Sequence, residues 1–168
     1  QLLCEGEGTL VLFSARRQMQ AVYEGIPESL RRQVLNQDEL GKQQIIRRHR
    51  DAIDNGDGSM IFGLASFAEG IDLPGDYCTH VVITRLPFAV PDDPVEATLA
   101  EWVRARGGQP FRDIALPDAA RRLMQATGRL LRTEQDRGKI TILDRRIVSK
   151  QYGKALLQSL PNYRLVTE

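Results

Sequence analysis

The chain has 168 residues, of which 42% are apolar, so it is long and apolar enough to bury the core of one domain. Its 23 basic and 22 acidic side chains leave a net charge of +1, so any binding of a polyanion would need a local basic patch. The two cysteines, Cys4 and Cys78, lie far apart in the sequence, which argues against a disulfide scaffold and against a zinc or iron–sulfur centre within this chain. No apolar run has the length of a membrane span and no signal peptide is visible, so we expect a cytoplasmic protein without a membrane partner. Because the chain starts without methionine in a polar segment, we also expect it to be a fragment of a longer protein.

Short apolar runs alternate along the chain with helical patterns. The runs are mainly apolar and do not alternate with polar residues. This pattern predicts strands buried on both faces, at 10–13, 33–36, 60–63, 80–84 and 139–143. Helices are expected at 15–23, 42–54, 94–106, 118–133 and 150–159. Ser14 and Asp118 are the expected N-caps of the first and fourth of these helices. Strands that alternate with helices form a mostly parallel sheet, so we predict an α/β fold with an open three-layer architecture, as one domain over 1–168.

Polar residues follow several of the predicted strands. They are Ser14, the loop Ser66–Asp72, Thr84 with Arg85, and the segment Asp144–Arg146. Ligands of open α/β sheets bind at the carboxyl ends of the strands, so these positions are candidates for a binding site. Ser14 and Arg16 would contact phosphate beside a helix N-terminus, or they are a capping serine and a solvated arginine.

The segment Gln125–Arg132 has the strongest pattern for binding phosphate. Gln125, Arg129 and Arg132 are spaced i, i+4, i+7, which places them on one face of the predicted helix 118–133. Arginine stays charged and binds oxyanions through two parallel hydrogen bonds. The alternative is an ordinary amphipathic helix whose arginines complement the helix dipole. Gly128 favours the phosphate site, because glycine inside a helix costs about 1 kcal/mol and its presence suggests close approach by a ligand or partner.

A second candidate is the segment Glu69-Gly70-Ile71-Asp72. Gly70 permits unusual backbone angles, and the Asp72 carboxylate can accept from a ribose hydroxyl, bind a cation through water or pair with an arginine. A turn with a local aspartate hydrogen bond explains the same residues. The chain has no G-x-x-x-x-G-K-[ST] phosphate loop and no acidic DEAH-like box, and neither histidine has metal-ligand partners at useful spacing.

The ordered set of motifs resembles a known family. Residues 10–19 are similar to helicase motif IV, Ser66–Gly75 to motif V and Gln125–Arg132 to motif VI. The amino-acid sequences of these motifs, and of the segments 86–94 and 143–146, are similar to those of the DinG type in the XPD-like branch of superfamily 2 helicases. One departure is Ala68, where XPD relatives tend to have serine, which puts a direct DNA contact by that side chain in doubt.

This resemblance implies the second RecA-like motor domain of an ATP-dependent 5′-3′ DNA helicase that acts in repair and replication. ATP with Mg²⁺ would bind in a cleft shared with the first motor domain, which would also hold the phosphate loop and a 4Fe–4S cluster. Arg132 and Arg129 would be arginine fingers, and Gln125 would orient the phosphate or the attacking water. Glu69, Gly70 and Asp72 would contact the nucleotide or couple its state to DNA. Single-stranded DNA, from forks, D-loops or R-loops, would contact Ser14, Arg16, Ser66 and Arg85.

Three other classes compete with this interpretation. A non-catalytic RecA-like module that docks nucleic acid or protein fits a chain without a phosphate loop, but it would not need the glutamine and arginines of 125–132. An RNA helicase domain would carry the same motif order. A dinucleotide-binding enzyme is disfavoured, because no G-x-G-x-x-G follows a predicted strand.

Overall fold

The computed structural model describes residues 7–89, 94–130 and 137–166. The chain divides into two compact units, Gln1–Arg85 with Ala126–Asp144 and Leu86–Gln125 with Arg145–Glu168. The single domain over 1–168 stays a prediction.

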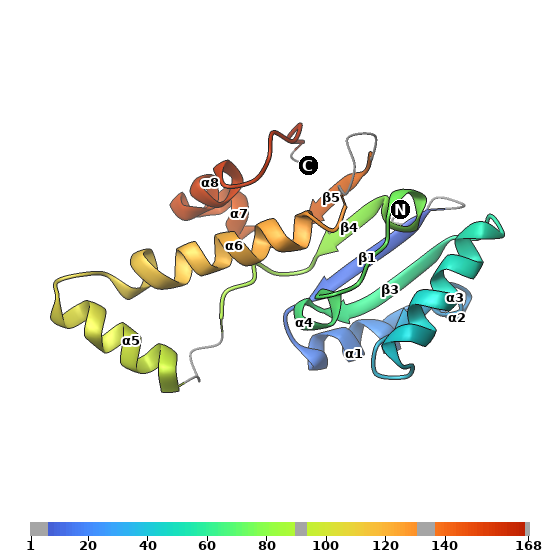
Figure 1. Ribbon diagram of the computed structural model, residues 1–168, viewed down its shortest axis with the longest axis horizontal. Coiled ribbons are helices and arrows are strands. Elements are labelled where there is room, and N and C mark those ends of the chain that lie inside the picture. Colours follow the sequence, from blue (N-terminus) through green and yellow to red (C-terminus); the bar gives the residue numbers. More distant parts are fainter. Residues whose placement is uncertain (1–6, 90–93, 131–136, 167–168) are drawn as a thin grey trace. The chain divides into compact units, whose positions relative to one another are not determined.

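The first unit is built on a five-stranded sheet (Figure 1). Its strands are β1 (Gly8–Phe13), β2 (Val34–Asn36), β3 (Ser59–Leu64), β4 (His80–Ile83) and β5 (Lys139–Ile142). Their order is β2-β3-β1-β4-β5, and all four pairings are parallel. Every residue of β1 and β4 is buried, as expected for strands covered on both faces. The predicted α/β class with a parallel sheet is confirmed.

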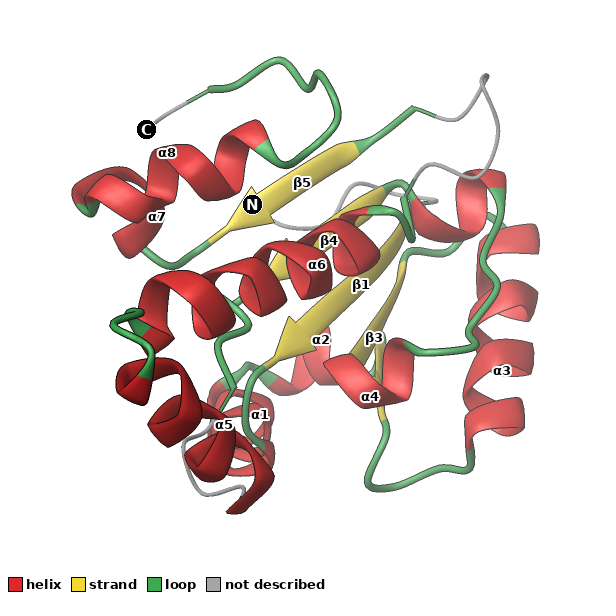
Figure 2. Cartoon of the chain, turned by 60° about the vertical axis from the view of Figure 1, so that its left-hand side comes forward, coloured by secondary structure: helices red, strands yellow, loops and turns green. Residues whose placement is uncertain are grey.

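Helices cover both faces of this sheet. Met19 of α1 (Arg16–Gly25) packs against Phe62 of β3, whereas His49 of α3 (Lys42–Asp54) bonds Ser59 of the same strand. Ser59 and Phe62 are three positions apart and therefore point to opposite faces, because side chains alternate along a strand. The helices α1 and α3 thus lie on opposite faces, and the expected three layers are present (Figure 2). Three short elements complete the unit: α2 (Glu28–Arg31), α4 (Ala65–Ala68) and η1 (Gly75–Cys78).

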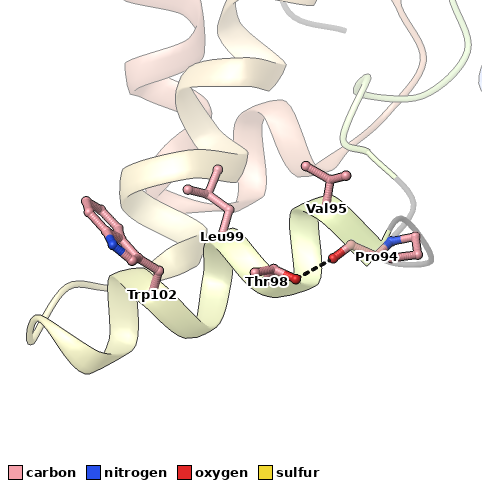
Figure 3. Close-up of a pocket in the computed structure, with 5 residues that line it drawn as sticks. All are labelled: Pro94, Val95, Thr98, Leu99 and Trp102. Atoms are coloured by element: carbon pink, nitrogen blue, oxygen red, sulfur yellow. Dashed lines mark hydrogen bonds between the residues drawn. The ribbon is translucent and has the colours of Figure 1, made fainter.

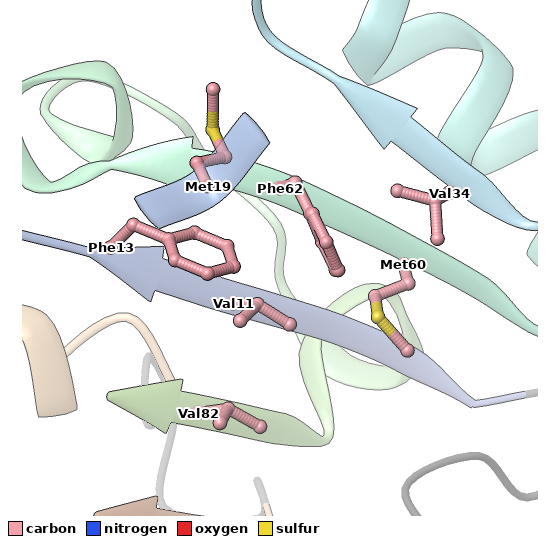
Figure 4. Close-up of a cluster of buried hydrophobic side chains, with 7 residues drawn as sticks. All are labelled: Val11, Phe13, Met19, Val34, Met60, Phe62 and Val82. Atoms are coloured by element: carbon pink, nitrogen blue, oxygen red, sulfur yellow. The ribbon is translucent and has the colours of Figure 1, made fainter. Parts of the chain in front are cut away.

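A hydrophobic cluster fills the space between the sheet and α1 (Figure 4). Its buried members come from four strands and this helix: Val11, Phe13, Met19, Val34, Met60, Phe62 and Val82. The rings of Phe13 and Phe62 lie 5.0 Å apart at 57°, a tilted arrangement that aromatic pairs prefer over a face-to-face stack. Tyr23 also packs against Phe62, with a centroid distance of 6.4 Å in an edge-to-face arrangement. Phe62 is therefore central to this core.

The second unit is helical. Its elements are α5 (Pro94–Ala105), the π-helical turn η2 (Phe111–Ala115), α6 (Leu116–Thr127, whose last two residues belong to the first unit), α7 (Arg146–Ser149) and α8 (Gln151–Gln158). Three aromatic rings from separate segments meet here, since Phe88, Phe111 and Tyr152 have centroids 5.2–5.6 Å apart. Gly153 lets α7 and α8 approach closely, because a Cβ at this position would lie 2.0 Å from the carbonyl oxygen of Ile147.

The structure corrects the predicted boundaries at both N-caps. Helix α1 begins after Ala15, and the Ser14 hydroxyl bonds the side chain of Gln18 at 3.4 Å instead of a backbone N–H. Helix α6 begins at Leu116, directly after η2, so Asp118 lies in its first turn and is not the N-cap. The Asp118 carboxylate bonds Arg121 and Arg122 at 2.7 and 2.6 Å. Partial burial raises the pKa of Asp118, but the bonds and charges of these arginines outweigh it and hold the pKa below its ordinary value.

The predicted helix 118–133 is wrong at its end, because α6 stops at Thr127. Gly128 follows. The next two amides bond carbonyls three residues earlier instead of four, Arg129 to Ala126 and Leu130 to Thr127, as in a turn. Glycine is a poor residue for continuing a helix, which explains the stop. Gln125 and Arg129 therefore do not share one helix face, and Arg132 lies outside the described residues.

Candidate functional site

The carboxyl edge of the sheet brings together residues that are distant in sequence. Ser14 follows β1, Ser66 lies in α4 just after β3, and Arg85 follows β4. Because β1 lies between β3 and β4 in a parallel sheet, the three positions share one edge. All three side chains are exposed. This placement matches the expected position for a binding site, but contact with DNA stays a prediction.

Local hydrogen bonds organise the centre of this edge. Ser14 donates to Gln18 at 3.4 Å. The Thr84 hydroxyl donates to the Leu12 carbonyl at 3.0 Å, which links the ends of β1 and β4. Arg16 is exposed, and its guanidinium pairs with Asp38 at 3.1 Å. An exposed ion pair of this kind is weak, so a phosphate group would compete for Arg16 at small cost.

The motif V loop (Ser66–Gly75) leaves this edge after β3. Gln37, which sequence reasoning missed, accepts from the N–H of Leu64 at 2.7 Å and fixes the point where the loop departs. Gly70 has a φ of +74°, in the left-handed region that favours glycine, so an alanine there would be strained. The side chains of Glu69 and Asp72, on either side of this turn, are exposed.

Arg129 joins motif VI to motif V. Its Nη1 donates to the carbonyl oxygen of Ile71 at 3.2 Å, across 58 residues of sequence and within the first unit. The contact places a half-buried guanidinium beside Gly70 and Asp72. Gln125 is exposed on α6 and belongs to the second unit. The structure thus unites Arg129 with the motif V loop. Gln125 does not share a helix face with Arg129, and the grouping with Arg132 stays a prediction.

Two further cations contact the same loop from α3. Lys42 Nζ donates to the carbonyl oxygen of Glu69, and Arg50 Nη2 donates to that of Asp72 at 2.8 Å. The only sequence signal was their spacing of eight residues, which puts both on one side of α3. Nothing in that spacing indicated backbone carbonyls as partners.

His49 anchors the far end of the loop to α3. Its side chain is fully buried, with Nδ1 2.8 Å from the Ser59 hydroxyl and Nε2 2.7 Å from the Tyr77 carbonyl oxygen. A carbonyl only accepts, so Nε2 carries the proton and Nδ1 accepts from Ser59. Burial lowers the pKa of His49 below its ordinary value of 6.5; the bond to Tyr77 opposes this shift, and the nearby Arg50 charge adds to it.

Acid should therefore destabilise the chain through His49. The folded-state pKa is below the unfolded value of 6.5, so as pH falls the unfolded chain takes up this proton first. The free energy of unfolding therefore decreases as the pH falls from 6.5 to the pKa of the folded state. Urea unfolding between about pH 8 and pH 5 should show a smaller acid-induced loss in His49→Gln than in wild type. Parallel pH profiles for the two proteins would contradict the assignment.

The second unit contains an apolar hollow of about 530 Å³ along α5 (Figure 3). It is lined by Pro94, Val95, Thr98, Leu99 and Trp102. The Thr98 hydroxyl is already bonded to the Pro94 carbonyl at 2.9 Å. None of the five lining side chains is charged, so the hollow lacks the groups that bind phosphate.

Comparison with known proteins decides the family. The family model of the helicase C-terminal domain matches residues 2–163, a range that covers most of both units. The chain belongs to the helicase C-terminal domain family. This is the family that the sequence resemblance predicted.

Similar proteins agree with this assignment. This chain is 43% identical over 168 residues to "ATP-dependent DNA helicase DinG" of Photobacterium profundum. The match covers 98% of this chain and 24% of that protein. The chain is 39% identical over 154 residues to the Escherichia coli (strain K12) protein of the same name, covering 92% and 21%. The chain therefore spans about a quarter of the length of the curated relatives it matches.

Solved structures show the same fold. The structure "XPD_APO" superposes with a TM-score of 0.69 at 23% identity, over 95% of this chain and 32% of that chain. The "Structure of S. tokodaii Xpd4" gives 0.62 at 17% identity, over 95% and 31%. At these identities the likeness concerns the fold alone, and it supports the predicted RecA-like, XPD-like architecture.

Metal sites and membrane spans are both absent from the part of the chain that the structure describes. No group of three histidine, cysteine or carboxylate side chains among those residues is arranged to hold a metal ion. No described helix is both long and apolar enough to cross a bilayer.

Proposed function

We propose that this helicase C-terminal domain is the second motor domain of an ATP-dependent 5′-3′ DNA helicase. The observation that carries the proposal is the bond from Arg129 to Ile71, which places a motif VI arginine against the motif V loop. The DinG relatives, which are named as ATP-dependent DNA helicases, support the assignment of ATP and DNA as substrates.

ATP would bind between this domain and a first motor domain in the same polypeptide. Arg129 and Arg132 would approach the γ-phosphate and stabilise the charge that develops during its transfer. Glu69, Gly70 and Asp72 would contact the nucleotide or pass its state to the DNA track, and Gln125 would orient the phosphate or water. Mg²⁺ would bind with ATP in the cleft that the two motor domains share, and the 4Fe–4S cluster would belong to the first motor domain.

The DNA track would follow the carboxyl edge of the sheet. Ser14, Arg16, Ser66 and Arg85 would contact backbone phosphates, which gives affinity without sequence preference. Forked DNA, D-loops and R-loops are the proposed structures. The proposed location is the cytoplasm, where a protein that acts on bacterial DNA, as the DinG relatives are named to do, would meet its substrate. Competition between single-stranded DNA and RNA of equal length tests the choice of nucleic acid; a preference for RNA would contradict it.

The isolated chain should hydrolyse no ATP, because the phosphate loop would lie in the other motor domain. The longer enzyme should hydrolyse ATP with stimulation by single-stranded DNA. Both activities are measured by phosphate release under the same conditions. Turnover by the isolated chain, or an inactive longer enzyme, would favour a docking module over a motor domain.

A further inference from the structure

Three cations from two parts of the first unit converge on the backbone of the motif V loop. Lys42 donates to the carbonyl of Glu69, Arg129 to that of Ile71 at 3.2 Å, and Arg50 to that of Asp72 at 2.8 Å. We call these contacts the carbonyl clamp. Hydrogen bonds from charged donors are stronger than bonds between neutral groups, so the clamp restrains a segment that lies outside the helices and strands.

Each α3 cation is also anchored on an aromatic ring. Lys42 Nζ lies 5.5 Å from the ring centroid of Phe67, and the Arg50 guanidinium carbon lies 5.3 Å from that of Tyr77. Phe67 is in α4, before the clamped carbonyls, and Tyr77 is in η1, after them. A cation over a ring is attracted by its negative face. Lys42 and Arg50 therefore connect α3 to the clamped segment and to the elements on either side of it.

The clamp fixes the segment that would act on the nucleotide. Gly70 turns the chain with a φ of +74° between the first two clamped carbonyls, and Lys42 Nζ lies 3.8 Å from the position of a Gly70 Cβ. Restraining the carbonyls at Glu69 and Asp72 limits the motion of the exposed carboxylates at the same residues. It also holds the Ile71 carbonyl where Arg129 meets it.

We propose that Lys42 and Arg50 are positioning residues, which hold the motif V loop in the geometry that receives Arg129 and the nucleotide. They act through the loop and do not themselves contact the reacting phosphate. The effect on catalysis rests on the proposed function, whereas the effect on loop order does not.

Amide hydrogen exchange of the chain itself tests the clamp directly. The double variant Lys42→Ala/Arg50→Ala should raise exchange of the hydrogen-bonded amides in 69–72, such as that of Ile71, which donates to the Ala68 carbonyl at 3.2 Å. The expected rise is about 10-fold or more, since one charged hydrogen bond is worth at least that factor. The control, Arg47→Ala/Arg48→Ala, removes two exposed cations from the same helix and should leave these amides unchanged. Lys42→Arg/Arg50→Lys keeps both charges and should restore most of the protection. Unchanged exchange in the alanine double variant, or an equal rise in the control, would overturn the proposal.

Kinetics of the longer helicase separate positioning from general stability. The alanine double variant should raise KM for ATP by about 10-fold and lower kcat, the loss expected for about one charged hydrogen bond, while its Tm stays near that of the control. The charge-preserving variant should recover both constants. If wild type hydrolyses ATP and the alanine double variant matches the control, the positioning role is wrong. If wild type itself is inactive, the motor function is wrong, and hydrogen exchange still decides the clamp.

Discussion

Replacing Arg129 with alanine in the proposed helicase should lower kcat for DNA-stimulated ATP hydrolysis by about 10³-fold, the scale of an arginine finger in phosphoryl transfer. The guanidinium is half-buried and held by the carbonyl of Ile71, so it is fixed in one place before any nucleotide arrives. Such preorganisation is what makes a charged group effective on a developing charge. Steady-state ATPase kinetics with saturating single-stranded DNA measure the effect.

Two controls separate this role from a structural one. Arg48→Ala removes an exposed cation from α3 and should leave kcat unchanged. Arg129→Lys keeps the charge but loses the planar fork, so its kcat should fall between those of wild type and Arg129→Ala. Affinity for single-stranded DNA should persist in all three variants. ATPase activity of Arg129→Ala within a few-fold of wild type would remove Arg129 from the catalytic assignment.

The sheet was predictable because buried parallel strands leave a strong signal. Runs such as Leu10–Phe13 and His80–Thr84 are apolar almost throughout, and their alternation with helical patterns indicated parallel order. Helix α3 matched its predicted bounds of Lys42–Asp54. The order of motifs along the chain then indicated the helicase family, which the family match confirms.

The contacts between cations and the motif V loop were less predictable. They depend on which carbonyls of the loop are left without a backbone N–H donor, and the sequence does not show this. No sequence pattern shows that the carbonyls of Glu69 and Asp72 will meet Lys42 and Arg50, since any cation near the loop would serve. The end of α6 was misjudged for a related reason. Gly128 was interpreted as a tolerated glycine within a helix with a functional purpose, but the helix stops one residue before it.

Phe62→Ala should lower the free energy of unfolding by about 3–5 kcal/mol, the cost of removing a large buried aromatic side chain from a packed core. Phe62 is 3% exposed. It lies beside the ring of Phe13 from β1 (Figure 4) and also contacts the ring of Tyr23 from α1. The surrounding residues come from several strands of a paired sheet, so they cannot collapse fully into the space left behind. Urea unfolding of the isolated chain, followed by circular dichroism, measures the change.

Leu30→Ala provides the comparison, because Leu30 is 42% exposed on the short helix α2. A large-to-small change at a surface position should alter the free energy of unfolding by about 0.5 kcal/mol or less. Phe62→Leu, which keeps much of the volume, should lie between these two variants. Equal losses of unfolding free energy in Leu30→Ala and Phe62→Ala would mean that the hydrophobic cluster between the sheet and α1 does not dominate the stability of the first unit. A loss confined to the Phe62 variants would mean that this cluster stabilises the sheet. The candidate motifs IV and V would then depend on it, because β1 and β3, the strands next to these motifs, supply Phe13 and Phe62.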